Sequence, residues 1–394
     1  MATEAVVVLA AVRTAVGDFG GGLKEVPPGD LAARVVGEAV RRAKVEPEAI
    51  AHCVFGQVIH TEPADMYLAR VAALRGGLPE AVPALTVNRL CGSGLQAVVS
   101  AAQQIQLGLC DFAVAGGAES MSRAGYLVPG ARFGLRMGDG VLVDMMTRAL
   151  HCPFSGVHMG VTAENVARRY GISRADQDAL ALESHRRATR AWAEGRFADQ
   201  IVPVEVPTRK GVVLFERDEH FRPDATLEDL ARLPPVFQEG GTVTAGNASG
   251  INDGAAALVL ASERAAARQG LAPLAHLVAY THAGVDPAYM GIGPVPAVRE
   301  LLARTGLAVD DIDLWEVNEA FAAQALAVAR ELKLPPERVN PNGSGISLGH
   351  PVGATGAILA VKAIHELIRT GGRRAVVALC IGGGQGIAAL LERP

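Results

Sequence analysis

The chain has 394 residues, of which 49% are hydrophobic and 20% are charged, and its formal net charge at pH 7 is −4. This composition is too apolar for a disordered chain and provides no broad basic field that would attract a nucleic-acid backbone. The length is sufficient for a large core divided over two or three folding units.

Short Val/Ala/Leu runs bounded by glycine recur along the chain and predict strands that are buried on both faces. Between them lie longer stretches with apolar residues at three- and four-residue steps, such as the helical face predicted from Leu95 to Ile105. This alternation predicts an α/β fold with mostly parallel strands. The predicted strands cover residues 6–11, 85–90, 112–115, 256–261, 314–317 and 376–379.

Two parts of the chain share the same order of sequence motifs. Cys91-Gly92-Ser93-Gly94, an apolar helix and a strand ending in two glycines are echoed near the C-terminus by Gly349-His350-Pro351, a helix and a strand ending at Cys380. The second helix is predicted from Ile358, Val361, Ile364 and Ile368. This order predicts two duplicated units that place Cys91 and His350 at equivalent corners, and chance similarity between α/β segments is the alternative.

The segment from residue 122 to 249 breaks the alternation, with Met/Arg/Gly-rich stretches and a polar helix near Arg174. We therefore expect an inserted loop domain over 122–249 between two core halves. These halves are expected at 1–121, completed by 250–272, and at 273–394.

The N-terminus lacks the features of a signal peptide, no apolar run is long enough to span a bilayer, and Leu391-Glu392-Arg393-Pro394 is no peroxisomal signal. We therefore expect a cytoplasmic protein that binds neither membrane nor nucleic acid. The five cysteines are scattered and form no CxxC pair, so free thiols and no metal site are expected.

Cys91 follows a predicted strand and opens a helix through small residues. The amides and dipole of a helix N-terminus favour an anion, so we expect a stabilised thiolate at this position. The small residues also let a substrate carbonyl approach backbone N–H groups. A structural cysteine at a tight turn is the alternative.

His350 lies among residues too small to cover an imidazole, so it is predicted to face a cavity and to act as a base for Cys91, with a packed histidine as the alternative. Cys380 ends an apolar strand before Gly382-Gly383-Gly384, where the N–H of Gly382 would stabilise an oxyanion. A phosphate-binding loop at these glycines is the weaker interpretation, because no GxxxxGK[ST] pattern is present.

Asn318 follows the predicted strand at 314–317 and begins the run Asn318-Glu319-Ala320-Phe321. An amide at a strand end can hold a water molecule against a substrate oxygen. Capping of the following helix by Asn318 is the alternative.

Together these motifs resemble the thiolase family, which comprises acetyl-CoA acetyltransferases and 3-ketoacyl-CoA thiolases. The resemblance runs through both halves and the insertion. It rests on Cys91-x-Ser-Gly, Asn318-Glu-Ala-Phe, Gly349-His350-Pro351 and Cys380-x-Gly-Gly-Gly, and on the stretches 132–138, 158–160 and 241–249. It departs from many relatives at Gly343-Ser344-Gly345-Ile346-Ser347, where the residues are still small.

The resemblance implies a duplicated, five-layered α-β-α-β-α core and a reversible reaction. Cys91 would be acylated, His350 would activate it and Cys380 would be the second acid/base. One oxyanion hole would combine His350 with a water held by Asn318, and the other the amides of Cys91 and Gly382. The acyl and pantetheine tunnel would be lined by His158, Met159, Phe237, Ala245, Gly246, Ser249, Met290, Ala320 and Phe321, with Arg222 near the nucleotide phosphates.

By the same resemblance, CoA and acyl-CoA are substrates with no permanently bound cofactor, and the chain forms a homodimer or homotetramer. The reaction would be CoA-dependent cleavage of a 3-ketoacyl-CoA, as in fatty-acid β-oxidation, or Claisen condensation of acetyl-CoA. Two alternatives remain at this point: a decarboxylating ketoacyl-synthase-like enzyme, which Cys380 disfavours, and a non-enzymatic lipid-binding homologue. The physiological direction and the acyl-chain length are left open.

Overall fold

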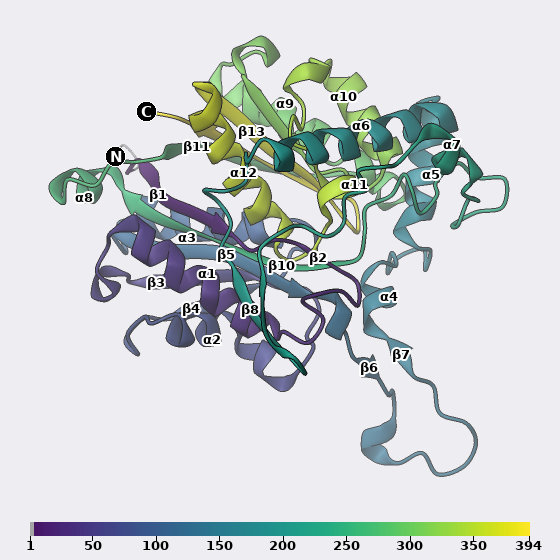
Figure 1. Ribbon diagram of the computed structural model, residues 1–394, viewed down its shortest axis with the longest axis horizontal. Coiled ribbons are helices and arrows are strands. Elements are labelled where there is room, and N and C mark those ends of the chain that lie inside the picture. The colour runs from purple at the N-terminus through teal and green to yellow at the C-terminus, as the bar shows by residue number, and fades with distance from the viewer. Residues whose placement is uncertain (1–3) are drawn as a thin grey trace.

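A computed structural model describes residues 4–394, which contain one large ten-stranded sheet (Figure 1). Its first half belongs to the N-terminal part of the chain and to the strand that returns after the 122–249 segment. From the outer edge inward, it consists of β4 (Ala84–Val87), β3 (His52–Gly56), β5 (Phe112–Ser120), β10 (Asn252–Ser262) and β1 (Val6–Arg13), with β2 (Gly17–Asp18) paired to β10.

The second half of the sheet repeats this order with C-terminal strands. Three residue pairs, from Val6↔Leu277 to Val8↔Ala275, join it to β1. From this seam outward it consists of β11 (Ala275–Gly284), β14 (Gln385–Glu392), β13 (Arg374–Ile381) and β12 (Leu314–Val317). Beyond β12 an isolated bridge between Trp315 and Val339 stands where the first half has its edge strand β4.

Helices cover both faces of each half. One buried cluster joins the first half to its outer helices, a second joins both halves to the central helices, and a third joins the second half to its outer helices. The expected five-layered, duplicated core is therefore confirmed. The outer helices are α1 (Pro28–Ala43) and α2 (Leu68–Arg75) on one side, and α9 (Pro294–Thr305) and α10 (Ala322–Leu332) on the other, while α3 (Ser93–Gln106) and α12 (Thr355–Thr370) form the centre.

The strands are not mostly parallel. Only the pairs β3·β4, β3·β5 and β12·β13 run parallel, whereas β1·β10, β5·β10, β11·β14 and β13·β14 run antiparallel. The sequence interpretation failed because burial on both faces requires only that helices cover both faces, and a stacked, duplicated core provides this for strands of either direction. Two local predictions also differ. Ile368 of α12 is 46% exposed, and the strand expected over 85–90 ends at Val87.

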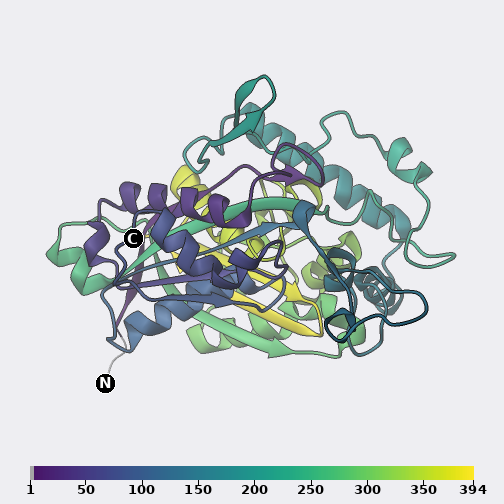
Figure 2. The same ribbon diagram turned by 90° about the horizontal axis from the view of Figure 1, so that it is seen from below.

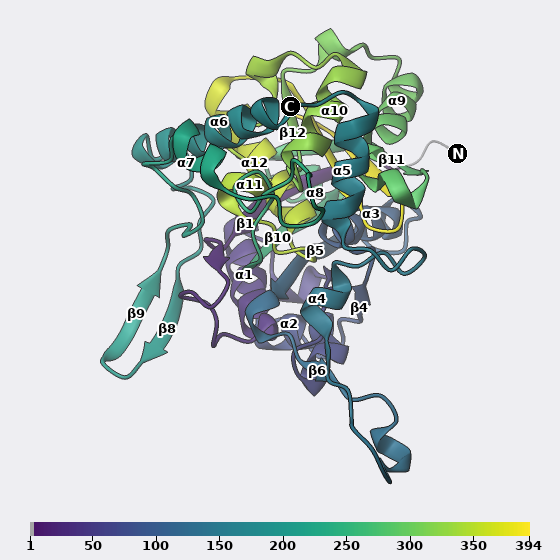
Figure 3. The same cartoon turned by 90° about the vertical axis from the view of Figure 1, so that its right-hand side faces the viewer.

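The 122–249 segment contributes elements outside the five layers. An arm with β6 (Tyr126–Leu127), β7 (Val143–Asp144) and α4 (Met145–Ala149) projects from the body (Figures 1 and 3), and its tip exposes 90% of Phe133 and 95% of Met137. A hairpin of β8 (Val204–Thr208) and β9 (Gly211–Phe215) also projects from the body, apart from the arm (Figures 2 and 3). The other α-helices of this segment are α5 (Met159–Arg169), α6 (Arg174–Ala193) and α7 (Leu227–Arg232). Outside the segment, α8 (Glu263–Arg268) follows β10, and α11 (Gly345–Leu348) precedes α12.

Within residues 4–394, no helix combines the length and the apolar character needed to cross a membrane.

Candidate active site

A cavity of about 480 Å³ lies where both sheet halves meet side chains of the 122–249 segment. It brings together most of the residues predicted from sequence. Asn318 lies behind the wall, and Gly246 lines an adjoining hollow. The predicted residues that do line the cavity are Cys91, His158, Met159, Arg222, Phe237, Ala245, Ser249, Met290, Ala320, Phe321, His350, Cys380 and Gly382.

Cys91 stands at a sharp corner between β4 and α3. Leu90, three residues after the end of β4, adopts a left-handed conformation with φ of 46° that turns the chain toward the helix. The hydroxyl of Ser93 accepts the Arg89 N–H at 2.8 Å and donates to the Leu90 carbonyl at 2.7 Å, so the corner is held by its own hydrogen bonds. The sulfur lies immediately before the first turn of α3.

The thiol of Cys91 is less acidic than its place at a helix N-terminus suggests. Burial raises its pKa to about 11, although the backbone N–H groups of Gly382 and of Cys91 itself hydrogen-bond toward the sulfur and lower it. Removal from water disfavours the charged form more than these amides favour it, in contrast to the thiolate expected from the sequence. The thiol needs a base.

His350 is buried, lines the cavity and has a defined tautomer. Its Nδ1 lies 2.7 Å from the Thr355 hydroxyl, which donates its only proton to the Pro351 carbonyl at 2.9 Å. This hydrogen-bond pattern assigns the ring proton to Nδ1, which leaves a lone pair on Nε2. Burial lowers the pKa of His350 to about 4, so at neutral pH the imidazole is an uncharged base.

Asn318 follows β12 and is fully buried behind His350. Its Nδ2 lies 3.4 Å from Nε2 of His350, and its Oδ1 has no hydrogen-bond partner within residues 4–394. The N-cap of α10 is Phe321, so Asn318 does not cap that helix. A buried amide oxygen without a protein partner favours a bound water at this position.

Cys380 lies near the end of β13 and is 1% exposed. Burial raises the pKa of its thiol well above the ordinary range, and the neighbouring Cys91 adds to the effect. The glycines that follow form the tight connection to β14, with positive φ at Gly383 and Gly384. A strand rather than a helix follows them, so the phosphate-loop interpretation is wrong.

Aromatic side chains form part of the cavity wall. The ring of His158 stacks on Phe237 with centroids 4.6 Å apart, and Phe237 meets Phe321 edge to face at 6.1 Å. Gly160 allows this packing, since a Cβ there would lie 2.2 Å from the Phe237 ring. Nδ1 of His158 accepts the Gly160 N–H, so in the neutral form its other nitrogen carries the proton.

The mouth of the cavity carries a charged cluster that sequence reasoning found only in part. Asp18 pairs with His220 through Nδ1 and with Arg222 at 3.1 Å, and the Arg222 side chain is 58% exposed. The hydrogen bond from His220 is the main cause that lowers the pKa of Asp18. Arg222 was expected here. Asp18 and His220 were missed because they are 202 residues apart and no local motif marks either.

Other lining residues were missed because a pattern of single apolar residues carries no signal for a cavity wall. They are Phe19, Met121, Leu150, Val236, Ala248, Gly250, Ile251 and Val352.

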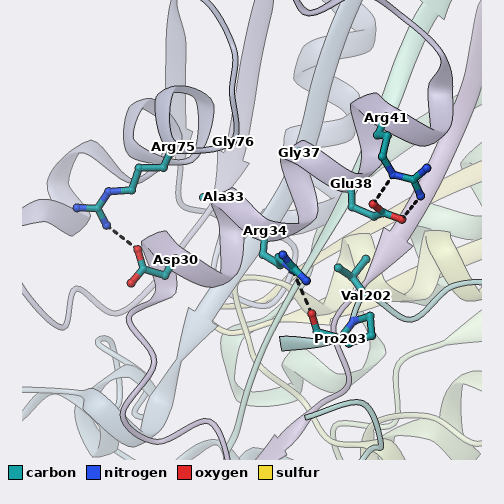
Figure 4. A pocket seen from close by; sticks show the side chains of 10 residues that line it. All are labelled: Asp30, Ala33, Arg34, Gly37, Glu38, Arg41, Arg75, Gly76, Val202 and Pro203. Carbon is teal, nitrogen blue, oxygen red and sulfur yellow. Dashed lines mark hydrogen bonds and ion pairs between the residues drawn. The ribbon is translucent and has the colours of Figure 1, made fainter. Parts of the chain in front are cut away.

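A separate hollow of about 570 Å³ lies over α1 (Figure 4). Its charged side chains are already paired near the surface: Arg75 with Asp30 at 2.6 Å and Arg41 with Glu38 at 2.7 Å. Arg34 donates to the Pro203 carbonyl. The predicted site residues lie elsewhere, so size alone does not identify the site. Among the described residues, no group of three or more His, Cys, Asp or Glu could hold a metal ion.

Two thiols, an imidazole and converging backbone amides in one cavity suit an enzyme that transfers an acyl group through cysteine. The family descriptions "Thiolase, N-terminal domain" and "Thiolase, C-terminal domain" match residues 6–264 and 271–393. The chain therefore belongs to the thiolase family and is an acyltransferase.

Individual relatives agree along the whole length. Beta-ketothiolase BktB of Cupriavidus necator is 64% identical over 392 residues, which cover 99% of this chain and 100% of that protein. The crystal structure of Bacillus anthracis acetyl-CoA acetyltransferase has a TM-score of 0.98 at 49% identity and covers 100% of both chains. Human mitochondrial 3-ketoacyl-CoA thiolase in complex with CoA has a TM-score of 0.96 at 45% identity, covering 99% of this chain and 98% of that chain.

Proposed function

We propose that the enzyme cleaves 3-ketoacyl-CoA with CoA, and in reverse condenses acetyl-CoA, through an acyl group on Cys91. The observation that carries this proposal is the convergence of Cys91, His350 and Cys380 on one cavity from three separate elements. A carbon–carbon cleavage of this kind needs a nucleophile, a proton shuttle and sites for two negative oxygens.

In the cleavage direction, Nε2 of His350 takes the Cys91 proton as the sulfur attacks the 3-keto carbon. The carbon–carbon bond then breaks, and its electron pair stays on the acetyl-CoA fragment as a carbanion. Cys380 is suited to protonate that carbanion because burial keeps it a thiol. The incoming CoA thiol gives its proton to the Cys380 thiolate, and its sulfur takes the acyl group from Cys91. The released Cys91 sulfur recovers the proton held by His350, which restores the starting state.

Two oxyanion sites follow from the same groups. The N–H groups of Cys91 and Gly382 already point toward the Cys91 sulfur, so we assign them to the thioester oxygen of acyl-Cys91. We assign His350 and a water held by Asn318 to the other oxygen. The neutral His350 offers no proton from Nε2 until it has received the one from Cys91.

We further propose that the 122–249 segment holds CoA. The aromatic wall of His158 and Phe237 suits the apolar part of pantetheine, and the exposed Arg222 suits a phosphate. CoA is a substrate in this scheme, with no permanently bound cofactor. The catalytic thiols must stay reduced, which favours the cytoplasm.

The exposed apolar tip of the arm favours association with further copies of the chain as a homodimer or homotetramer. Sedimentation of the native chain and of a Phe133→Ser/Met137→Ser variant tests this proposal. Loss of the larger species in the variant supports it, and an unchanged mass contradicts this role of the arm.

The decisive experiment measures both partial reactions. Acetyl-CoA is expected to acetylate Cys91, as found by mass spectrometry, and to protect it from iodoacetamide. Acetoacetyl-CoA cleavage is expected to exceed malonyl-thioester decarboxylation by orders of magnitude. Preferred decarboxylation would support the ketoacyl-synthase alternative, and an unacylated but liganded protein would support a non-enzymatic one. A series of 3-ketoacyl-CoA lengths then defines the acyl specificity.

A further inference from the structure

The segment from His350 to Gly353 belongs to the second half of the chain but rests on strands of the first half. On β5, a Cβ added to Gly117 would lie 2.2 Å from the Gly353 carbonyl oxygen. On β10, a Cβ added to Gly254 would meet Pro351 at 3.5 Å. The backbone that carries the catalytic histidine therefore lies directly against the sheet that leads to Cys91.

Two buried side chains on these same strands hold the ends of this segment. Oδ1 of Asn252 accepts the His350 N–H at 2.9 Å, and Oε2 of Glu119 accepts the Gly353 N–H at 2.8 Å. Glu119 pairs with Gly254 across the two strands. Because alternate residues of a strand share a face, Asn252 and Glu119 flank Gly254 on one face of the sheet.

Each of these side chains is also fixed from behind. Asn252 donates from Nδ2 to the Gly17 carbonyl at 3.1 Å, and Glu119 accepts the N–H groups of Val58 at 3.0 Å and Ile59 at 3.1 Å. Both side chains are fully buried.

The space around Asn252 is shaped for its amide. A Cβ on Gly349, where φ is 103°, would lie 2.5 Å from the Asn252 side chain, and one on Gly250 would lie 2.7 Å from its Oδ1. Glycine at both positions lets the amide reach the His350 backbone.

We propose that Glu119 and Asn252 are positioning residues that set His350 against Cys91 across the boundary between the two halves. This inference rests on the proposed function, in which His350 is the base for Cys91. Neither residue lines the cavity, and each accepts a backbone N–H of the His350–Gly353 segment. Asn252 also lies 3.4 Å from Oδ1 of Asp18, which lines the cavity, so Glu119→Gln is the cleaner test of the two. A misplacement of about 1 Å in such a pair can cost roughly 10²-fold in rate.

The test uses the full-length chain and the variants Glu119→Gln and Asn252→Ala. In Glu119→Gln, either orientation of the amide turns its NH2 group toward at least one backbone N–H that the carboxylate accepts. We expect kcat to fall about 10- to 100-fold in both variants. In Glu119→Gln the KM for acyl-CoA should stay within about twofold, because none of the backbone groups that Glu119 holds lines the cavity. Alkylation of Cys91 by iodoacetamide at neutral pH should slow by a similar factor.

Asp313→Asn is the matched control. Oδ2 of Asp313 accepts the backbone N–H groups of Arg373 at 2.8 Å and Arg374 at 2.9 Å, beside the N-terminal end of β13 and away from Cys380. The same exchange of carboxylate for amide there should leave kcat and the alkylation rate unchanged.

A double-mutant cycle with His350→Asn separates positioning from general structural damage. If Glu119 acts through His350, adding Glu119→Gln to His350→Asn slows alkylation no further. Equal slowing in both backgrounds, or native kcat in the folded single variants, overturns the inference. If His350→Asn itself keeps native alkylation and turnover, the proposed function fails instead. Circular dichroism checks folding: if one single variant does not fold, the other carries the test, and if neither folds, a purely structural role is accepted.

Discussion

The two halves of the core share one strand order but differ at their outer edges. In the first half β4 pairs with β3 in full and leads within a few residues to Cys91 and α3. In the second half a single bridge at Val339 replaces that strand, and the chain passes through α11 before reaching His350. The comparison teaches that the repeated fold provides the scaffold, whereas the irregular edge of one copy provides room for the base.

The largest expected effect is on the corner of the first half. Cys91→Ser should lower the rate of acetoacetyl-CoA cleavage by at least about 10³-fold, because a hydroxyl is a far weaker nucleophile than a thiolate. A coupled thiolysis assay measures this rate, with Cys110→Ser as the control because Cys110 does not line the cavity. Native turnover in Cys91→Ser would contradict the proposed mechanism.

The second half contains a buried ion pair, Lys362 with Glu316 at 2.8 Å, whereas the buried pair of the first half joins Arg13 to Asp218 of the 122–249 segment at 2.8 Å. Lys362→Ala should lower the free energy of unfolding by about 3–5 kcal/mol, because it leaves Glu316 buried without its partner. Denaturant unfolding measures this change. Arg304→Ala, which breaks the exposed pair with Glu300, is the control and should cost less than about 1 kcal/mol. Equal losses in the two variants would contradict the expected role of burial.

Cys380→Ser should separate the two partial reactions. We expect carbon–carbon cleavage to fall roughly 10²- to 10³-fold, as for the loss of a general acid, while acetyl-CoA still acetylates Cys91. Mass spectrometry of the intact protein follows the acetyl group, and the thiolysis assay follows turnover. If acetylation falls as far as cleavage, Cys380 is needed in both steps and the division of labour proposed here is wrong.

Arg222→Ala should have a smaller effect, since its side chain is exposed and already paired with Asp18. We expect KM for CoA to rise about three- to tenfold with kcat nearly unchanged, and the effect to shrink at high salt. Arg232→Ala is the control, because that side chain is exposed and paired with Asp229 outside the cavity. An unchanged KM in Arg222→Ala would remove Arg222 from the proposed phosphate site.

The smallest expected effect concerns pH. Burial depresses the pKa of His350 to about 4, so the imidazole remains a neutral base above that pH and gains a proton only as the pH falls through about 4. Between pH 6 and 8, kcat/KM should therefore change less than about twofold on account of this group. An acid limb centred near pH 6.5 would show that His350 is solvated in the working enzyme.

The shared location of Cys91, His350 and Cys380 could be predicted from the sequence because glycine surrounds them, and their chemical roles remain a proposal. Cys91, His350 and Cys380 each lie beside small residues, which bury little apolar surface and are therefore unusual as a run in an ordinary core. The structure brings all three to one cavity. The duplicated layers were also predictable, since the two helix-and-strand patterns repeat in order.

Other features depend on contacts that no local pattern contains. The antiparallel pairing of β5 with β10 joins residues more than 100 positions apart, and the pKa of Cys91 depends on how completely the fold excludes water. Glu119 and Asn252 were not singled out, because a buried acid or amide in a strand has no sequence signature until its backbone partners are known.

The stack of His158 on Phe237 has a consequence for how this catalyst can diversify. Both rings come from the 122–249 segment, whereas each sulfur and the catalytic imidazole come from the layered core. Exchanges at the two rings can reshape the space offered to a substrate tail without moving the atoms that make and break bonds. Substitutions in this wall can therefore change which substrates the enzyme accepts while its reaction stays the same.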